Sequence, residues 1–263
     1  MPLSQRRRRL VGRLRNRKTR AREGQVLVEG VRAVGEALAA GAEVAFACVS
    51  PRLDDVGGGP GLVEALHGAG VEVVSLGDDE LVHLADTEHP QGVLLVCREP
   101  GGDVRALQAA GRYLVLDAIQ DPGNVGTLIR AAVAFDLDAV LVLDGTADPW
   151  SPKAVRASAG LLFRLPIHCL DAEPAVELVL TAGIDLLVAA AEGTDIRQVS
   201  PAGGWALAVG NEGAGVRDEL RSACRHTVAV HMPGPAESLN AGIAGAILLH
   251  ALSGAPTVEK RHA

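Results

Sequence analysis

The hydrophobic positions of this chain fall into short runs that alternate with helical patterns. Gly41 and the Gly-Pro loop at 57–60 separate some of these runs. In the first third of the chain, the pattern predicts strands at 25–29, 44–50, 71–76 and 92–97 and helices at 31–40, 61–69 and 78–85. Such alternation is typical of a small α/β unit.

A longer alternation begins at residue 113. It predicts strands at 113–119, 139–143, 165–169, 185–191, 205–209 and 227–232, with helices between them and a last helix from 238 to about 252. Runs such as LVL, VLVL and LLVA have no polar face, which favours a parallel sheet covered by helices on both sides. We therefore expect a basic arm (1–22), a small α/β domain (23–99), a linker (100–112) and a larger α/β domain (113–256).

Charge is distributed unevenly along the chain. Residues 1–22 contain ten Lys or Arg and no acid, and removing these ten from the total of 25 leaves 15 basic residues against 32 acidic ones. A cationic segment on an acidic body is typical of proteins that bind nucleic acid. The alternative is a solvated or disordered terminus without a partner.

Several functional classes are disfavoured by what the sequence lacks. Its apolar runs are shorter than the roughly 20 residues of a membrane span, and the basic N-terminus has no apolar core of a signal peptide. The four cysteines lack CxxC spacing, so we expect no metal site and a reducing, cytoplasmic location. GxxxxGK[ST], GxGxxG and GxSxG motifs are missing, which disfavours an NTPase, a dinucleotide enzyme and an α/β-hydrolase.

Three polar loops follow predicted strands. In the first, a Pro-Gly pair ends the strand 113–119, and Asn124 occupies the expected N-cap position of an apolar helix at 125–135. The unpaired N–H groups of a helix start form an anion site, to which Arg130 would add a planar guanidinium. A capped helix with a structural arginine is the alternative interpretation.

The second loop is the glycine-rich run 209–215, which holds one acid, Glu212. A carboxylate directly after a buried strand is costly unless it has partners. We expect Glu212 to hold Arg130 or a neighbouring backbone amide. A simple tight turn remains the alternative.

The third loop, 232–240, contains two prolines that should keep the chain extended until Ser238 caps the last helix. Asn240 is expected inside the first turn of that helix, facing the ligand, with Ile243 at core spacing. Capping by Ser238 needs no ligand, so this triplet is weak evidence when taken alone.

Together, the three loops resemble the signature motifs of the SpoU/TrmH family, which are RNA ribose 2′-O-methyltransferases of the SPOUT class. The resemblance covers most of residues 113–252, including the segment 150–160, and two segments at 28–34 and 89–93 resemble the family's N-terminal substrate-binding domain. It implies that the larger domain carries a trefoil knot and that the smaller one binds substrate. It also implies S-adenosyl-L-methionine as cofactor and a homodimer with its active site near the subunit interface.

Position by position, the resemblance implies that the cofactor is surrounded by Gly210, Val230, Met232 and Leu239. It assigns catalysis to Asn124, Arg130, Glu212, Ser238 and Asn240. One departure is His231, which stands where the family usually has proline and loosens the backbone there.

Methyl transfer to a ribose hydroxyl needs orientation and electrostatic stabilisation more than a metal. Because a guanidinium stays protonated under ordinary conditions, we interpret Arg130 as a clamp for the target phosphate and the developing alkoxide rather than as a base. Asn124 would orient Arg130 or the ribose, while Ser238 and Asn240 would shape the knot and the target pocket. Deprotonation would involve the phosphate or a water.

The expected function is methylation of 23S ribosomal RNA. Transfer RNA and an antibiotic-resistance methylase remain rival assignments within the class. From another class, a non-catalytic RNA-binding ribosome-assembly factor with the same fold remains open.

Overall fold

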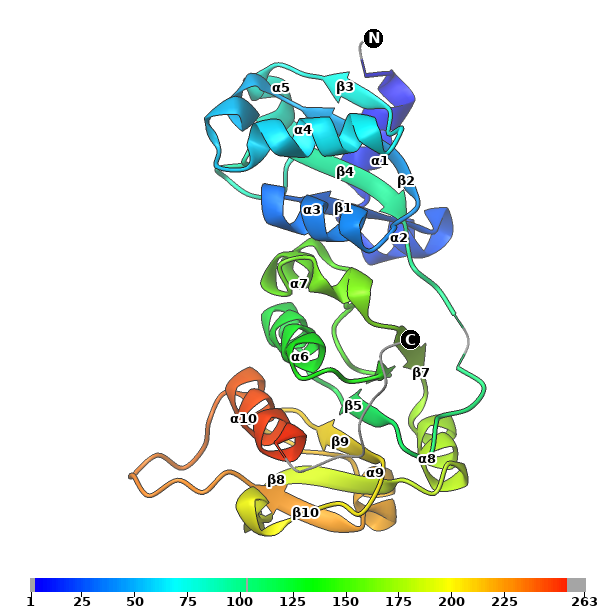
Figure 1. The fold of residues 1–263 in the computed structure, drawn as a ribbon, viewed down its shortest axis with the longest axis vertical. Helices are drawn as coiled ribbons and strands as arrows, with labels where there is room; N and C mark the ends of the chain where they lie inside the picture. Colours follow the sequence, from blue (N-terminus) through cyan, green and yellow to red (C-terminus); the bar gives the residue numbers. More distant parts are fainter. Residues whose placement is uncertain (1–2, 103, 255–263) are drawn as a thin grey trace. The chain divides into compact units, whose positions relative to one another are not determined.

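The computed structural model describes residues 3–102 and 104–254 and contains two compact units (Figure 1). The first unit comprises the chain up to Pro100 together with Asp148–Arg164. The second comprises Gly101–Ala147 and the chain from Leu165 onwards. The segment 148–164, which the sequence pattern grouped with the larger domain, thus packs with the first unit.

A four-stranded mixed sheet forms the centre of the first unit. Its order is β1-β4-β2-β3, with β4 antiparallel to both β1 and β2, and β3 parallel to β2. The bounds are β1 Gln25–Glu29, β2 Val44–Val49, β3 Val73–Ser75 and β4 Val93–Arg98. All four strands lie where the hydrophobic pattern predicted them.

Helices cover this sheet, and two of them come from the basic N-terminal segment. That segment forms α1 and α2, in which Val11, Leu14 and Arg20 are buried, so it is an ordered part of the unit and not a free arm. Val11 and Leu14 join a core with Leu27, Phe46 and residues of α5. The bounds are α1 Gln5–Arg13, α2 Arg17–Glu23, α3 Val31–Ala39, the short 3₁₀ helix η1 Pro51–Asp55, α4 Gly59–Gly68 and α5 Asp78–Leu84.

The inserted segment contributes α7 (Pro152–Ala157) and the 3₁₀ helix η2 (Leu161–Arg164) to the first unit. Gly160 has φ +82°, and a Cβ there would lie 2.6 Å from the Cα of Ala33. Only glycine permits this approach. Arg20, which is only 2% exposed, forms an ion pair with Asp148 and donates to the carbonyls of residues 14 and 15.

The second unit contains a six-stranded sheet in which every pairing is parallel. Its order is β10-β8-β9-β5-β6-β7. The bounds are β5 Arg112–Leu116, β6 Ala139–Leu143, β7 Ile167–Leu170, β8 Asp185–Asp195, β9 Trp205–Val209 and β10 His226–Ala229. Burial of β5, β6 and β9 along their whole length explains why their sequences lack a polar face.

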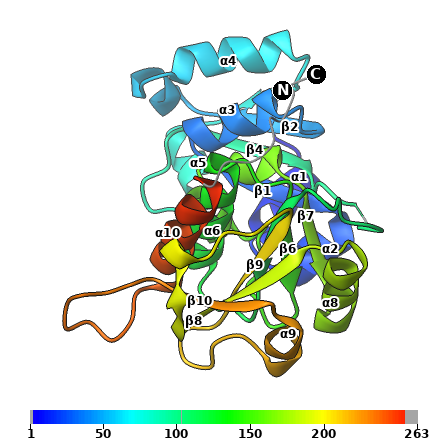
Figure 2. The same ribbon diagram turned by 60° about the horizontal axis from the view of Figure 1, so that its bottom comes forward.

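Helices cover both faces of this sheet (Figure 2). On one face α6 packs against α10, and on the other α8 packs against α9 over a core that includes Val115, Leu141, Ala208 and Leu220. The bounds are α6 Pro122–Ala134, α8 Ala172–Thr181, the 3₁₀ helix η3 Ile196–Gln198, α9 Asp218–Ala223 and α10 Ala241–Ser253. No helix in the described ranges is long and apolar enough to cross a membrane.

The strand order reverses between β5 and β9. From β5 the chain proceeds outward to β6 and β7, and it then crosses to the other side of β5 to form β8, β9 and β10. In open α/β sheets, ligands bind at the carboxyl ends of the strands beside such a reversal. The loops after β5 and β9 flank this point and are two of the three loops singled out in the sequence.

Candidate active site

A chain of side-chain hydrogen bonds joins the three polar loops. Asn124 Nδ2 donates to Glu212 Oε1 at 2.5 Å, and Asn240 Nδ2 donates to Asn124 Oδ1 at 3.0 Å. Asn124 is only 8% exposed, so its amide is committed to these two contacts. Residues 88 and 116 positions apart in sequence therefore meet at one place.

The two helix starts at this place are capped differently from the prediction. Asp121, not Asn124, is the N-cap of α6: its side chain accepts from the amide of Gly123, and Pro122 follows at the first helical position. Asn240, not Ser238, caps α10 by accepting from the amides of Gly242 and Ile243. Because Asp121 performs the capping, the Asn124 amide is free to bind Glu212.

Arg130 lies on the exposed side of α6. Within the described part of the chain its guanidinium makes no hydrogen bond or ion pair, and the expected pairing with Glu212 is absent. Glu212 holds Asn124 instead, so that part of the prediction is wrong. The expectation of a core position for Ile243 is also wrong, since this side chain is 53% exposed.

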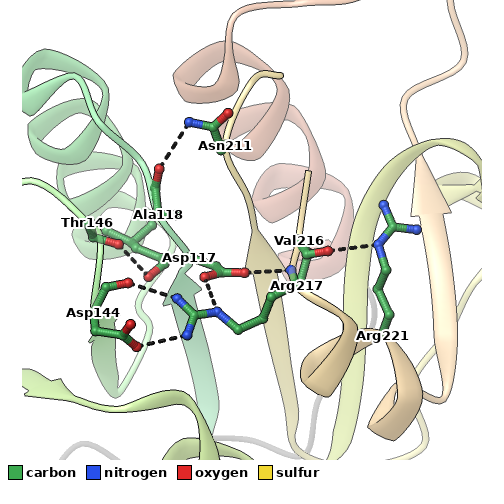
Figure 3. A network of polar contacts seen from close by, with 9 residues as sticks. Asp117, Ala118, Asp144, Thr146, Asn211, Val216, Arg217 and Arg221 are labelled. Carbon is green, nitrogen blue, oxygen red and sulfur yellow. Dashed lines mark hydrogen bonds and ion pairs between the residues drawn. The ribbon is translucent and has the colours of Figure 1, made fainter. Parts of the chain in front are cut away.

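A second polar network fixes the loop after β9 (Figure 3). Asp117, at the end of β5 and 1% exposed, accepts from the backbone amide and from Nε of Arg217, both at 2.7 Å. The other guanidinium nitrogens of Arg217 donate to the carboxylate and carbonyl oxygens of Asp144, both at 2.8 Å. Desolvation acts to lower the pKa of Arg217, but the hydrogen bonds to Asp144 and Asp117 outweigh it and raise the pKa.

Asn211 organises the turn itself. Its Oδ1 accepts from the amides of Gly213 and Ala214. Its Nδ2 donates to the carbonyl of Ala118 at 3.2 Å (Figure 3). Ala118 has φ +54°, a conformation that is strained for a residue with a Cβ. The contact from Asn211 helps to hold this backbone, which links the first loop to the second.

A cavity of about 320 Å³ lies beside the middle of β8 and the carboxyl ends of β9 and β10. Small residues and backbone line much of it, including Ala189–Ala191 and the turn 210–215. Apolar side chains line other parts. Among the residues named from the sequence, those lining the cavity are Gly210, Glu212, Val230, Met232, Ser238 and Leu239.

Backbone geometry explains how the cavity forms. A Cβ on Gly210 would lie 2.3 Å from the carbonyl of Gly215, so the turn closes only with glycine at this position. In β8 the pairing with β10 shifts register after Thr227, where partners jump from Val188 to Thr194. The intervening residues of β8 bulge out of the pairing, and several of them line the cavity.

An ion pair joins two of the residues that line the cavity. Arg221 donates from Nε to the carbonyl of Val216 at 2.8 Å and pairs with Glu192 at 3.2 Å. A hydrogen bond from its own backbone amide, followed by the one from Arg221, lowers the pKa of Glu192.

Sequence reasoning missed Asp117, Asn211 and Arg217 as parts of the site. A detectable signal was present, because a buried aspartate directly after an apolar strand needs a cationic partner. The Asp-Pro pair at 121–122 is also the usual arrangement of an N-cap followed by proline.

Comparison with known proteins agrees with this geometry. The model of the SpoU rRNA methylase family matches residues 111–250, and that of the MRM3-like substrate binding domain matches residues 8–95. The 23S rRNA (guanosine(2553)-2′-O)-methyltransferase of Bacillus subtilis is 37% identical over 186 residues, which is 70% of this chain and 74% of that protein. The 23S rRNA (uridine(2479)-2′-O)-methyltransferase of Streptomyces viridochromogenes is 30% identical over 247 residues, covering 90% and 85%.

Among solved structures, the SpoU methyltransferase AviRb from Streptomyces viridochromogenes, in complex with the cofactor AdoMet, aligns with a TM-score of 0.83 at 29% identity. The alignment covers 94% of this chain and 96% of that one. The match thus extends over both units, and the family resemblance indicated by the three loops is confirmed. This chain belongs to the SpoU rRNA methylase family of RNA 2′-O-methyltransferases.

Proposed function

We propose that this protein transfers a methyl group from S-adenosyl-L-methionine to a ribose 2′-hydroxyl of 23S ribosomal RNA. The observation that carries the proposal is the convergence of Asn124, Glu212 and Asn240 beside a cavity that the turn after β9 lines, next to the strand-order reversal. Similarity to two 23S rRNA 2′-O-methyltransferases supports ribosomal RNA as the substrate. The proposal also includes a cytoplasmic location for the enzyme and its RNA.

The cavity suits the proposed cofactor. About 320 Å³ lies within the range of small-molecule sites, and its glycine and alanine lining leaves backbone groups accessible to a polar ligand. Val230, Met232 and Leu239 offer apolar contacts for a flat ring, and Gly210 allows the closest backbone approach. When bound there, S-adenosyl-L-methionine would supply an activated methyl group.

The roles of the polar residues follow from their contacts. Glu212 lines the cavity and holds Asn124, which in turn holds Asn240, so the three form a fixed polar wall next to the cofactor site. Ser238 lines the same cavity and would contact cofactor or ribose. Arg130 is exposed and unpaired within the described residues, so its guanidinium is available to clamp an RNA phosphate and to stabilise the alkoxide.

The proposal includes a homodimer. Ile243 and Ile247, one turn apart on α10, are 53% and 39% exposed. This apolar pair lies on the helix that packs against α6, which carries Arg130. A second copy of the chain that covered these two side chains would bury apolar area. It would also bring groups of the partner subunit close to Arg130, which Glu212 does not orient because it binds Asn124.

The proposal also includes the trefoil knot. In a knotted domain the last helix would pack against segments that precede it in the chain. In support, α10 contacts α6, β9 and η3, the 3₁₀ helix that precedes β9. The loop from β10 to α10 makes a long excursion before the chain returns to the sheet (Figure 2).

The decisive experiment is a map of ribose methylation across ribosomal and transfer RNA from a strain that lacks the gene. Loss of one 23S ribose methyl, restored by the wild-type gene but not by the Asn124→Ala gene, is the expected result. Loss confined to transfer RNA would overturn the substrate. If calorimetry showed no binding of S-adenosylhomocysteine at micromolar concentration, the non-catalytic assembly factor would be the better assignment.

A further inference from the structure

The ten basic residues of the N-terminal segment 1–22 divide into two groups. Five of them have partners within the first unit: Arg7 pairs with Glu72, Arg8 with Glu80, Arg15 with Asp86, Arg20 with Asp148, and Arg22 with Glu23. The other five, Arg6, Arg9, Arg13, Arg17 and Lys18, are exposed and make no ion pair or side-chain hydrogen bond within the described residues. Four of the first group thus join the N-terminal segment to other parts of the first unit, whereas Arg22 pairs only with its neighbour and the second group has no such contacts.

Three of the unpaired arginines form one stripe. Arg6, Arg9 and Arg13 are spaced by three and four residues, which places them on the same face of α1 over about 10 Å. All three line a groove of about 740 Å³. Like charges at this spacing destabilise a helix, and α1 contains no acidic residue to offset them. The stripe thus lacks a stabilising role within the described part of the fold.

The rest of the groove suits an anion. Ser4, Thr19 and Gln25 add neutral hydrogen-bonding groups, and its one acid, Glu23, is held by Arg22 at 2.7 Å. Its one aromatic ring, Phe46, is 3% exposed and lies under the guanidinium of Arg7 at 4.7 Å. The groove therefore offers charge and hydrogen bonds but no ring on which a base could stack.

These observations distinguish between classes of polyanion. Recognition of single-stranded RNA depends on aromatic stacking, and none of the six aromatic residues of the chain is exposed. A membrane surface would require an apolar helix face, but Val11 and Leu14 of this region are buried in the core. Double-helical RNA is read through phosphates and shape, and a rigid row of guanidinium groups matches such a backbone.

We propose that the groove between α1 and α2 binds the phosphate backbone of double-helical RNA, with Arg6, Arg9 and Arg13 contacting the phosphates. The proposal rests on the RNA-methyltransferase function and locates part of its substrate-binding surface. Binding at this groove is independent of base sequence and depends strongly on salt.

The test compares the full chain with the variant Arg6→Gln/Arg9→Gln/Arg13→Gln. The control variant Arg98→Gln/Arg105→Gln/Arg225→Gln removes the same charge from exposed positions outside the groove. Fluorescence anisotropy measures binding of two RNA duplexes of unrelated sequence, a single-stranded RNA of equal length and a poly-glutamate peptide, from about 50 to about 200 mM salt. Calorimetry with S-adenosylhomocysteine and thermal melting are measured on every variant.

The groove variant is expected to weaken binding of both duplexes equally, by roughly 100-fold at about 0.15 M salt, and to reduce the salt slope by about 3. The control variant should stay within about threefold of wild type. The proposal would be overturned if the groove and control variants lost duplex affinity equally. It would also be overturned if the wild type bound poly-glutamate or single-stranded RNA as tightly as it binds the duplexes. If the groove proposal fails in this way but the wild type binds S-adenosylhomocysteine, the proposed function stands. If the wild type does not bind S-adenosylhomocysteine, the proposed function itself fails.

Discussion

The amide of Asn124 donates to the carboxylate of Glu212 at 2.5 Å, across the reversal in strand order between β5 and β9. Asn124 also accepts a hydrogen bond from Asn240, the N-cap of the last helix. One buried amide therefore fixes the relative positions of α6, the turn after β9 and α10.

Removal of that amide should impair catalysis more than cofactor binding. For Asn124→Ala we expect kcat to fall about 10²-fold, because Glu212 and Asn240 lose their common partner. S-adenosylhomocysteine binding should change little, because Asn124 does not line the cavity. Thr127→Ala, one turn along α6, is the control and should stay near wild type. A large loss of affinity with normal kcat would contradict the assignment.

Two glycines of one turn should respond differently to the same substitution. Gly210→Ala would place a methyl group 2.3 Å from the Gly215 carbonyl and force the turn open, so we expect loss of S-adenosylhomocysteine binding. At Gly213 the nearest atom to the new methyl would be Asn211 Oδ1 at 3.5 Å, an ordinary contact, so Gly213→Ala should bind nearly normally. Calorimetry on the pair checks this prediction, and equal affinities would show that the turn does not shape the cofactor site.

The two acids that hold Arg217 should contribute unequally to stability. Asp117 is 1% exposed, and Asp117→Asn removes the buried charge that pairs with Arg217, whose side chain is 24% exposed, so we expect unfolding to become easier by about 2 kcal/mol. Asp144 is 56% exposed and Asp144→Asn should cost less than about 1 kcal/mol. Urea denaturation of both variants measures the difference. Equal costs would mean that the buried pair is not an important stabilising contact.

Apolar exposure on α10 predicts the oligomeric state. Ile243→Glu/Ile247→Glu should convert the proposed dimer to a monomer, because two carboxylates cannot be buried unpaired at an interface. Leu180→Glu on α8 is the control, since Leu180 is 57% exposed but lies on the opposite face of the sheet. Light scattering after gel filtration reports the masses. A monomeric wild type would refute the dimer.

Two buried thiols should make stability fall at alkaline pH. Burial raises the pKa of Cys48 and of Cys97 to about 12, whereas the unfolded chain ionises them near 9. Above pH 9 the unfolded state therefore binds fewer protons than the folded state. Stability should decline as pH rises from 9 towards 12, by up to about 1.4 kcal/mol per pH unit for each thiol.

Urea titrations across this range check the thiol prediction, with Cys48→Ala/Cys97→Ala as the comparison. The double variant should show a shallower decline. An unchanged decline would assign the alkaline sensitivity to other groups. In the native protein, a thiol reagent at pH 8 should modify the exposed Cys169 rapidly and leave Cys48 and Cys97 untouched until the chain unfolds.

The helix register around Asn124 shows where prediction from sequence failed. Six residues at about 100° each place Arg130 about 120° around α6 from Asn124, so the two side chains face different directions. Glu212 could bind only one of them, and in the structure it binds Asn124. The strand-to-helix pattern favours Asn124 as the N-cap of α6, but the preceding Asp-Pro pair supplies the cap.

The amino-acid sequence alone determined the strands of the described residues, the α/β class and the family, because buried parallel strands need continuous apolar runs and ligand loops need particular glycines and prolines. It did not determine that 148–164 packs with the first unit. Only the tertiary structure decided which polar groups pair. The partners of Asn124, Asp117 and Arg20 lie 88, 100 and 128 residues away. Such pairings depend on how strands are ordered within a sheet and how helices pack on it, and local sequence preference carries no information about either.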